Sequence, residues 1–215
     1  MLRGLRGRLL EIGCGTGVMV PDLLAMGFEV CGIDVSSEMV RRADQHMAGH
    51  PLASRCRLNV GDVERLEFPD AFFDVVLAMG VLEYLPSYHK ALQEIARVLK
   101  PSGHVVLAVP NRASAYHVLR AAYLRTRQVI RRPRATQWAG NPCVPWRLDR
   151  DIAAVGLGKV ESEACNFIFF PLKELSQGAS DALNRALMPL SRTTIARLLG
   201  SQYMVKGRKS ARRSP

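Results

Sequence analysis

The sequence predicts an α/β fold in which a doubly wound, mostly parallel sheet carries helices on both faces, and three observations support this prediction. Short apolar runs alternate with helical patterns over the first half of the chain. The first run, Leu9–Ile12, leads directly into a loop with glycine at every second position, namely Gly13, Gly15 and Gly17. An acidic residue, Asp34, closes the second run. Together these features are typical of a Rossmann-like sheet.

The apolar runs have the length of strands. Phe73–Met79 is almost entirely apolar, as expected of a central parallel strand buried on both faces. His104–Val109 follows the turn residues Pro101–Gly103 and ends at Pro110. The strands that the sequence predicts are Leu9–Ile12, Phe28–Ile33, Cys56–Val60, Phe73–Met79, His104–Val109, a stretch within Val160–Phe170, and Tyr203–Lys206.

Helical patterns separate these runs. Pro21 suits the first turn of a helix and Gly27 suits its end, which predicts a helix over Val18–Met26. Apolar residues recur at helical spacing in later segments. The other expected helices run from a serine cap (Ser36 or Ser37) to Met47, and over Tyr88–Leu99, Tyr116–Ile130, Leu148–Val155 and Leu172–Leu199, the last with a break at Pro189.

This organisation predicts one domain over residues 1–208, followed by a basic tail, residues 209–215, that we expect to be disordered. The alternation of strands and helices breaks at Asn111. We therefore expect residues 111–146 to form a helical insertion after the fifth strand. The insertion combines arginines with apolar side chains, and we expect it to act as a lid that selects the substrate.

The composition argues against a membrane-spanning, secreted or disulfide-rich protein. The 215 residues carry a formal net charge of +11. No apolar run approaches the roughly 18 residues of a membrane span, and the N-terminus lacks the apolar core of a signal peptide, which predicts a cytoplasmic protein. The five cysteines are widely spaced without a C-x-x-C pair, which argues against a metal or disulfide framework. The basic excess is compatible with plain solubility, an anionic membrane surface, an acidic substrate or RNA.

Several segments in consecutive order resemble the motifs of class I S-adenosylmethionine-dependent methyltransferases. Within that superfamily they are similar to the small-molecule group around the ubiquinone and menaquinone methyltransferases. The segments that carry this resemblance are Leu10–Gly17, Gly32–Met39, Gly61–Asp62, Phe73–Val76 with Val81–Tyr84, and Arg97–His104. The resemblance covers the chain closely from Leu9 to Val109 and loosely beyond. It implies a seven-stranded sheet with an antiparallel last strand.

The resemblance also implies a site for S-adenosylmethionine, with S-adenosylhomocysteine as product. Asp34 is expected to hold both ribose hydroxyls, and Asp62 to accept from the adenine amino group. Glu11 is expected to form hydrogen bonds around the loop and the cofactor amino group. The full set of implied cofactor-binding residues is Glu11, Gly13, Cys14, Gly15, Gly17, Asp34, Val35, Met39, Asp62, Val63, Met79 and Gly80.

Methyl transfer from a sulfonium needs an oriented acceptor and, for oxygen or nitrogen, sometimes a base. The candidates are Glu83, Tyr84 and His117. Related quinone O-methyltransferases carry glutamate and histidine at the positions of Gly80 and Tyr84 and bind a divalent metal there. Because only Glu83 is kept, we expect no metal. The expected acceptor is a small, hydrophobic or amphipathic molecule methylated on oxygen, nitrogen or carbon. We further expect peripheral contact with an anionic membrane surface, leave a homodimer open, and do not expect nucleic acid.

Three other functions compete with this interpretation. A nicotinamide dehydrogenase would carry G-x-G-x-x-G, whereas this loop reads G-x-G-x-G. An RNA-modifying methyltransferase would use the basic surface, but the segment after the fourth strand lacks the Asn/Asp-Pro-Pro-aromatic run that exocyclic-amine enzymes share. A non-catalytic homologue that only binds the cofactor is the third alternative. The sequence favours a methyltransferase of small molecules.

Overall fold

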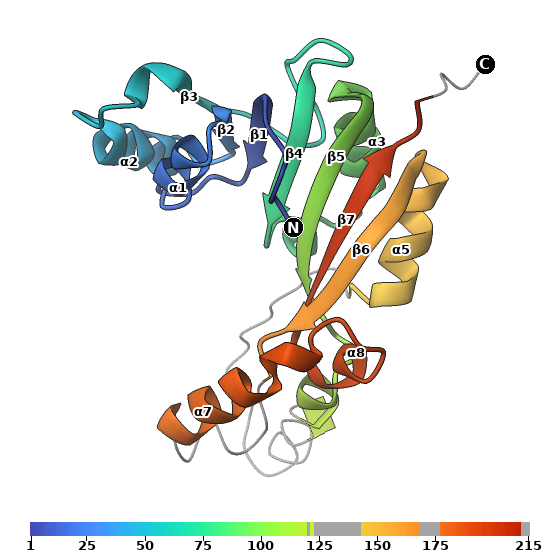
Figure 1. Cartoon of the computed structure of the whole chain (residues 1–215). Coiled ribbons are helices and arrows are strands. Elements are labelled where there is room, and N and C mark those ends of the chain that lie inside the picture. The colour runs from blue at the N-terminus through green and yellow to red at the C-terminus, as the bar shows by residue number, and fades with distance from the viewer. Residues whose placement is uncertain (120, 123–142, 168–176, 212–215) are drawn as a thin grey trace, which may run out of the picture.

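The computed structural model describes residues 1–119, 121–122, 143–167 and 177–211. Within these residues a sheet of seven strands has the order β3-β2-β1-β4-β5-β7-β6 (Figure 1). The first five strands are parallel, and β7 runs antiparallel to both of its neighbours. The predicted fold class is thereby confirmed. The strands are β1 (Arg8–Ile12), β2 (Glu29–Asp34), β3 (Cys56–Val60), β4 (Phe73–Met79), β5 (Leu99–Pro110), β6 (Leu157–Cys165) and β7 (Gln202–Lys209).

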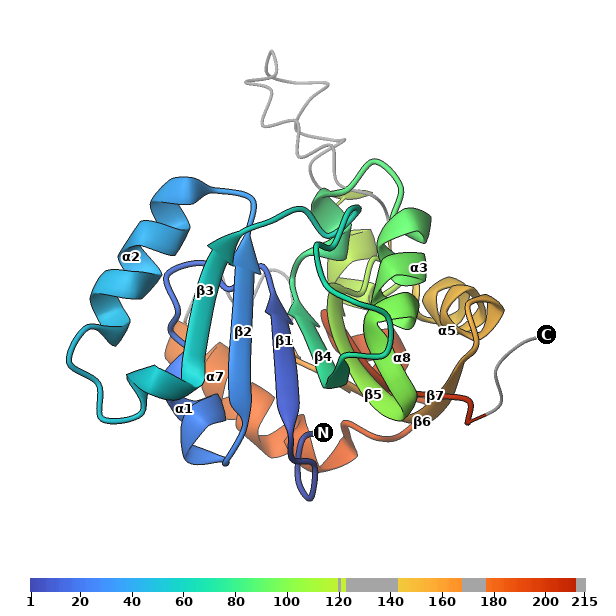
Figure 2. The ribbon, with the colours of Figure 1, turned by 90° about the horizontal axis from the view of Figure 1, so that it is seen from above.

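Helices pack on the two faces of the sheet and define two cores (Figure 2). One core joins α1 to β1, β2 and β4 through residues such as Leu23 and Leu24. The other joins α3 and α5 to the opposite face through residues such as Leu92 and Ile152. The described helices are α1 (Val20–Ala25), α2 (Ser37–Met47), α3 (His89–Val98), α5 (Pro145–Ala154), α7 (Gln177–Leu187) and α8 (Ala196–Leu199), with 3-10 turns η1 (Ala53–Arg55), η2 (Leu82–Tyr84) and η3 (Met188–Leu190).

Local signatures read from the sequence explain several helix ends. Pro21 lies in the first turn of α1, where a missing N–H costs nothing. The side chain of Ser36 caps α2 by accepting from the Met39 amide. The predicted break at Pro189 is confirmed, because η3 separates α7 from α8. The predicted start of that helix, residues 172–176, lies outside the described residues.

Several boundaries differ from the predictions. The strand expected at His104 already begins at Leu99, and the residues between them loop out, since Phe73 pairs with Leu99 and Val75 with His104. Ser102 has a positive φ of 65° in this loop, so the predicted turn exists inside the strand. The helix expected at Leu148 begins three residues earlier, at a proline suited to a first turn.

The C-terminal strand reaches further than predicted. β7 ends at Lys209, which the sequence had placed in a disordered tail. The Lys209 ammonium donates to the carbonyl oxygens of Ala96 and Leu99 at 2.6 and 2.7 Å. It therefore binds the carboxyl end of α3, where helix carbonyls lack partners and cations are favoured. Residues 212–215 lie outside the described residues.

The predicted insertion over residues 111–146 is described only at its two ends. Residues 115–119 and 121–122 are helical, in agreement with the beginning of the helix expected over Tyr116–Ile130. Residues 120 and 123–142, with most of the arginines and the proposed lid, lie outside the described part of the chain. The role of this segment stays a prediction.

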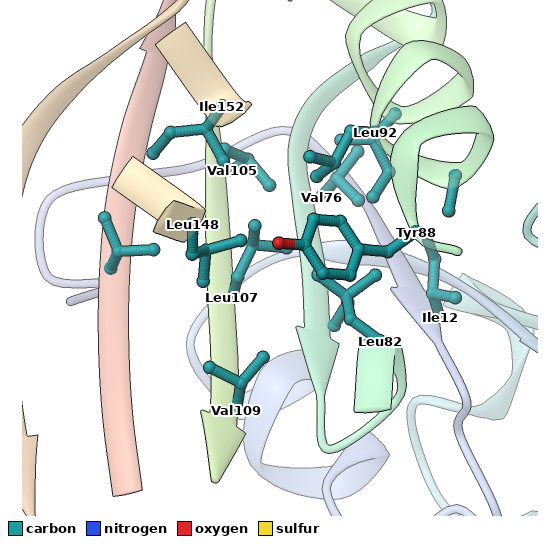
Figure 3. Close-up of a cluster of buried hydrophobic side chains, with 14 of the residues drawn as sticks. Ile12, Val76, Leu82, Tyr88, Leu92, Val105, Leu107, Val109, Leu148 and Ile152 are labelled. Atoms are coloured by element: carbon teal, nitrogen blue, oxygen red, sulfur yellow. The ribbon is translucent and has the colours of Figure 1, made fainter. Parts of the chain in front are cut away.

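Tyr88 links the two helices that cover the second face. Its ring is buried among Leu82, Leu92 and Leu107, and its hydroxyl points towards α5 (Figure 3). The hydroxyl donates to Asp151 of α5 at 2.9 Å. Asp151 is buried, so this hydrogen bond replaces water that the carboxylate has lost. Burial and the Asp151 carboxylate both raise the pKa of Tyr88, which keeps the hydroxyl protonated as a donor.

We expect Tyr88→Phe to lower the free energy of unfolding by about 2 kcal/mol, because the variant leaves a buried carboxylate short of one donor. Urea denaturation measures this change. Tyr116→Phe removes a half-buried hydroxyl for which the described residues supply no partner, and should change stability by less than about 0.5 kcal/mol. Equal stability of the two variants would show that the Tyr88–Asp151 bond contributes nothing.

Candidate functional site

The loop after β1 is held by the backbone of β2. The amides of Gly13 and Cys14 both donate to the Ile33 carbonyl, at 2.8 and 2.9 Å. Gly13, Gly15 and Gly17 all have positive φ angles, between 54° and 73°, a region that side chains with a Cβ disfavour. The alternating glycines therefore let the chain turn sharply from β1 towards α1 at the carboxyl end of the sheet.

The three glycines face different surroundings. A Cβ on Gly13 would lie 2.5 Å from Cγ2 of Val81, and a Cβ on Gly17 would lie 3.0 Å from the Cβ of Ala43 in α2. A Cβ on Gly15 would meet no protein atom within 4 Å. Of the three glycines, only Gly15 would direct a Cβ into open space, whereas a Cβ on Gly13 or Gly17 would crowd other protein atoms.

Asp34 connects the loop to the next strand and helix. One carboxylate oxygen accepts from the Gly15 amide at 2.9 Å, and the other accepts from the Ser36 amide at 2.9 Å. Each oxygen can accept a further hydrogen bond, because a carboxylate offers about four acceptor positions. The side chain is only partly buried and lines a cleft. Its carboxylate can therefore bind a ligand hydroxyl while it orders the loop.

The cleft lies at the carboxyl ends of β1, β2 and β4, where open α/β sheets bind ligands. Its volume is about 440 Å³, within the usual range for small-molecule sites. Asp62 lines it and accepts from the Glu64 amide at 2.8 Å, so this side chain also holds its own turn. The lining residues are Ile12, Gly13, Ile33, Asp34, Val35, Gly61, Asp62, Val63, Glu64, Gly80, Val81, Tyr84 and Leu85.

The cleft includes half of the cofactor residues expected from the sequence. Gly13, Asp34, Val35, Asp62, Val63 and Gly80 line it. Glu11, Cys14, Gly15, Gly17, Met39 and Met79 do not, although most of them lie on the elements that form it. Met79 packs into the core beneath α1. Sequence reasoning missed Val81 and Leu85, whose apolar side chains follow β4 directly and could have been inferred from that position.

Both the sequence and the fold of this chain resemble those of known proteins. Residues 10–107 match the family described as "Methyltransferase domain". The match covers 98 of the 215 residues, so this part of the chain is similar to a methyltransferase domain. The motif resemblance found in the sequence is confirmed.

The curated relatives that this chain resembles carry different names. A phosphatidylethanolamine N-methyltransferase of Cereibacter sphaeroides is 39% identical over 101 residues, covering 47% of this chain and 49% of the relative. A ubiquinone biosynthesis O-methyltransferase of Rhodopseudomonas palustris is 33% identical over 174 residues, covering 80% and 65%. A sterol 4-C-methyltransferase of Caenorhabditis elegans is 32% identical over 98 residues, covering 46% and 29%. The chain thus spans between 29% and 65% of the length of these relatives.

Solved structures share the fold. A SAM-dependent methyltransferase from Methanosarcina mazei superposes with a TM-score of 0.68 at 17% identity, covering 95% of this chain and 93% of that one. A SAM-dependent methyltransferase from Archaeoglobus fulgidus superposes with a TM-score of 0.65 at 21% identity, covering 97% and 88%. Because the sequence identities are this low, these two structures show only that the fold, including the mixed sheet, is shared.

S-adenosylmethionine is the cofactor that a domain of this family implies, and the residues fit it. Gly15 borders open space, Asp34 keeps acceptor capacity towards the cleft, and the cleft has the volume of a small-molecule site. Oε2 of Glu11 is buried and has no hydrogen-bond partner within the described part of the chain. Such an acceptor suits the positively charged amino group of the cofactor.

Glu11 is a buried carboxyl group with a raised pKa. Its side chain lies at the end of β1 with an exposed fraction of only 4%. Burial raises the pKa of Glu11 from 4.5 to about 7, because an ionised carboxylate loses its hydration there. Burial, with the charges of Glu11 and Asp34, raises the pKa of the neighbouring Cys14 thiol to about 12. Cys14 is therefore a packing residue, since a thiol with such a pKa is not a nucleophile at neutral pH.

The three candidate bases occupy different places. Tyr84 lines the cleft and is 65% exposed. Glu83 is 5% exposed and lies beside Gly80, and burial raises its pKa although the charge of Arg112 acts in the opposite direction. His117 lies in the helical stretch 115–119 and is not among the residues of the cleft. Of these candidates, the structure brings only Tyr84 to the cleft, and the roles of all three stay predictions.

We expect Gly13→Ala to destabilise the domain more than Gly15→Ala. Both alanines would need a positive φ, at a cost of roughly 1–2 kcal/mol, but only the first would also collide with Val81. Val81→Ala should recover part of the loss when combined with Gly13→Ala, as urea denaturation of the four variants can measure. If the two glycine variants lose equal stability and Val81→Ala recovers none, the packing argument is wrong.

Glu11→Gln should change how stability depends on pH. Because the folded-state pKa is raised, the carboxyl is protonated at low pH, and the folded state loses stability as pH rises from about 4.5 to about 7. Glutamine removes this ionisation. The stability of the variant relative to the original should therefore rise by about 3 kcal/mol between pH 4 and pH 8.

Denaturation with urea at pH 4, 5, 6, 7 and 8 measures this difference. Glu29→Gln, which alters an exposed carboxylate on the adjacent strand, is the matched control and should show no comparable trend. A flat difference between Glu11→Gln and the original protein would mean that Glu11 ionises as freely in the folded state as in water.

Proposed function

We propose that this chain transfers the methyl group of S-adenosylmethionine to a small, hydrophobic or amphipathic acceptor. The observation that carries the proposal is the double hydrogen bond of Asp34, which fixes the Gly15 loop and α2 around a cleft at the carboxyl ends of the strands. The match of residues 10–107 to a methyltransferase domain supports it.

When bound, the cofactor supplies an activated methyl group, so the protein needs chiefly to orient the acceptor and exclude water. In our proposal Asp34 accepts from the two ribose hydroxyls, and Asp62 accepts from the adenine amino group through the oxygen that does not hold its own turn. Val35 and Val63 contact the adenine faces. Glu11 receives the ammonium group, and Gly80 lines the methionine end.

The acceptor class follows from the far end of the cleft. Beyond Gly80 the lining side chains are Val81, Tyr84 and Leu85, which offer apolar surface and one hydroxyl. Relatives whose names refer to a sterol, to phosphatidylethanolamine and to ubiquinone biosynthesis support an acceptor with apolar character. We propose that Tyr84 contacts the acceptor. Glu83 is buried beside it and, with the Arg112 charge nearby, is the second candidate for a proton acceptor.

Other parts of the expected function stay predictions. No helix among the described residues is long and apolar enough to cross a membrane. Peripheral contact with an anionic membrane, a cytoplasmic location, a homodimer and a metal-free site are expectations from the sequence. RNA modification and cofactor binding without turnover are the alternative functions, and the experiment below distinguishes them.

We expect Asp34→Ala to weaken binding of S-adenosylhomocysteine by at least about 30-fold, because two charge-assisted hydrogen bonds are lost. Isothermal calorimetry measures the affinity. Asp44→Ala, which removes an exposed carboxylate from α2, should leave it within about twofold. The original protein and both variants are then incubated with methyl-labelled donor and separate pools of lipid extract and total RNA.

The proposal requires label in the lipid pool from the original protein and from Asp44→Ala, and none from Asp34→Ala. Label in RNA alone would support the RNA alternative. Cofactor binding with no labelled product in either pool would support the non-catalytic homologue. Absence of cofactor binding by folded protein would overturn the proposal entirely.

A further inference from the structure

The face of β3 that points away from α2 is open. None of the five residues of this strand is buried, whereas parallel strands are normally covered on both faces. Residues 61–72, which connect β3 to β4, contain no helix that could cover it. Figure 2 shows β3, β2 and β1 without a helix in front of them, while α3 covers the neighbouring part of the sheet.

A groove of about 470 Å³ follows this open face and is separate from the cofactor cleft. Cys31, Arg57 and Asn59 from β2 and β3 contribute to its lining, and Phe68 and Phe72 from the connecting segment lie beside them. The two phenylalanine rings stack with their centroids 6.4 Å apart. The groove therefore combines an apolar wall with a polar floor, and all its residues belong to the described part of the chain.

The charge of the groove is unbalanced. Arg8, Arg55 and Arg57 line it together with a single acid, Glu29. Arg8 already lies 3.6 Å from Glu29 and over the ring of Phe72. Arg55 donates to the Gly27 carbonyl. The guanidinium of Arg57 has no hydrogen bond or ion pair among the described residues, and the residue is exposed. A ligand that carries carboxylates would complement this surface.

The outer edge of β3 is also open. β3 is the terminal strand of the sheet, and among the described residues it pairs only with β2. Its outward backbone amides and carbonyls can therefore pair with another extended chain. The strand contains no proline that would prevent such pairing. An extended peptide could add to this edge and place alternate side chains over the groove.

We propose that this groove and edge bind an extended, acidic segment of a partner protein, which adds a strand to β3 and places carboxylates beside Arg57 and Arg55. A second copy of this chain fits less well, because it would bring the same arginines into the same groove. Nucleic acid fits less well, because it has no amide groups to pair with a strand edge. The inference does not depend on the proposed methyl transfer.

The probe is a fluorescent ten-residue peptide that alternates glutamate and valine. Fluorescence anisotropy should show binding to the full chain, and Arg57→Glu should weaken it at least tenfold. Arg185→Glu, which makes the same charge change on α7 outside the groove, should leave the affinity within about twofold. A peptide that alternates glutamate and proline keeps the charge but lacks alternate amide donors, and it should bind at least tenfold more weakly.

Hydrogen exchange locates the peptide. Saturating glutamate–valine peptide should slow exchange of the amides in residues 56–60. Equal losses for Arg57→Glu and Arg185→Glu, equal binding of the two peptides, or unchanged exchange at β3 would each overturn the proposal. So would Arg57-dependent binding of an RNA oligonucleotide in the absence of peptide binding. Urea denaturation, measured in parallel, reports whether Arg57→Glu is folded and does not depend on cofactor binding.

Discussion

The arrangement at the carboxyl end of this sheet depends on one carboxylate. Asp34 accepts from the Gly15 amide with one oxygen and from the Ser36 amide with the other, and so joins the loop after β1 to the start of α2. The Ile33 carbonyl, one residue earlier, holds two further loop amides. The tip of β2 therefore fixes both turns that border the cleft. Two backbone amides already fix the Asp34 carboxylate. A ligand that donates a hydrogen bond to this carboxylate therefore causes little further loss of side-chain conformational entropy.

The fold was predictable because its signals are local. The apolar run of β4 and the serine cap of α2 each report a single element, and both were confirmed. The position of Asp34 was predictable as well, because it closes the apolar run of β2 and therefore lies at the carboxyl end of that strand. The burial of Glu83 and the packing of Gly13 against Val81 were not predictable, because they depend on how the segment around η2 lies against the loop after β1. The extension of β7 to Lys209 likewise depends on carbonyls of a distant helix.

Two buried acids beside the cleft destabilise the fold when they ionise. Glu11, in β1, and Glu83, in the turn η2 after β4, each keep one oxygen without a partner among the described residues. Burial raises the pKa of both, so both destabilise the folded state when they ionise. Carboxyl groups of this kind suit a site that receives a cationic ligand, because the ligand then supplies the missing counter-charge. Removing either carboxyl group would stabilise the domain at pH values where that group is ionised.

The cofactor cleft and the open groove are connected through one segment of chain. A smaller hollow between them shares Ile33, Gly61 and Asp62 with the cleft, and shares Asn59 and Phe68 with the groove. The segment from Gly61 to Phe68 is therefore a wall of both sites. It contains no helix, but Arg97 of α3 donates to the carbonyl oxygens of Leu66 and Phe68, and Glu94 of α3 accepts from the Leu66 amide. Because α3 already holds this wall in place, neither ligand needs to order it, and binding in one site should leave the affinity of the other unchanged.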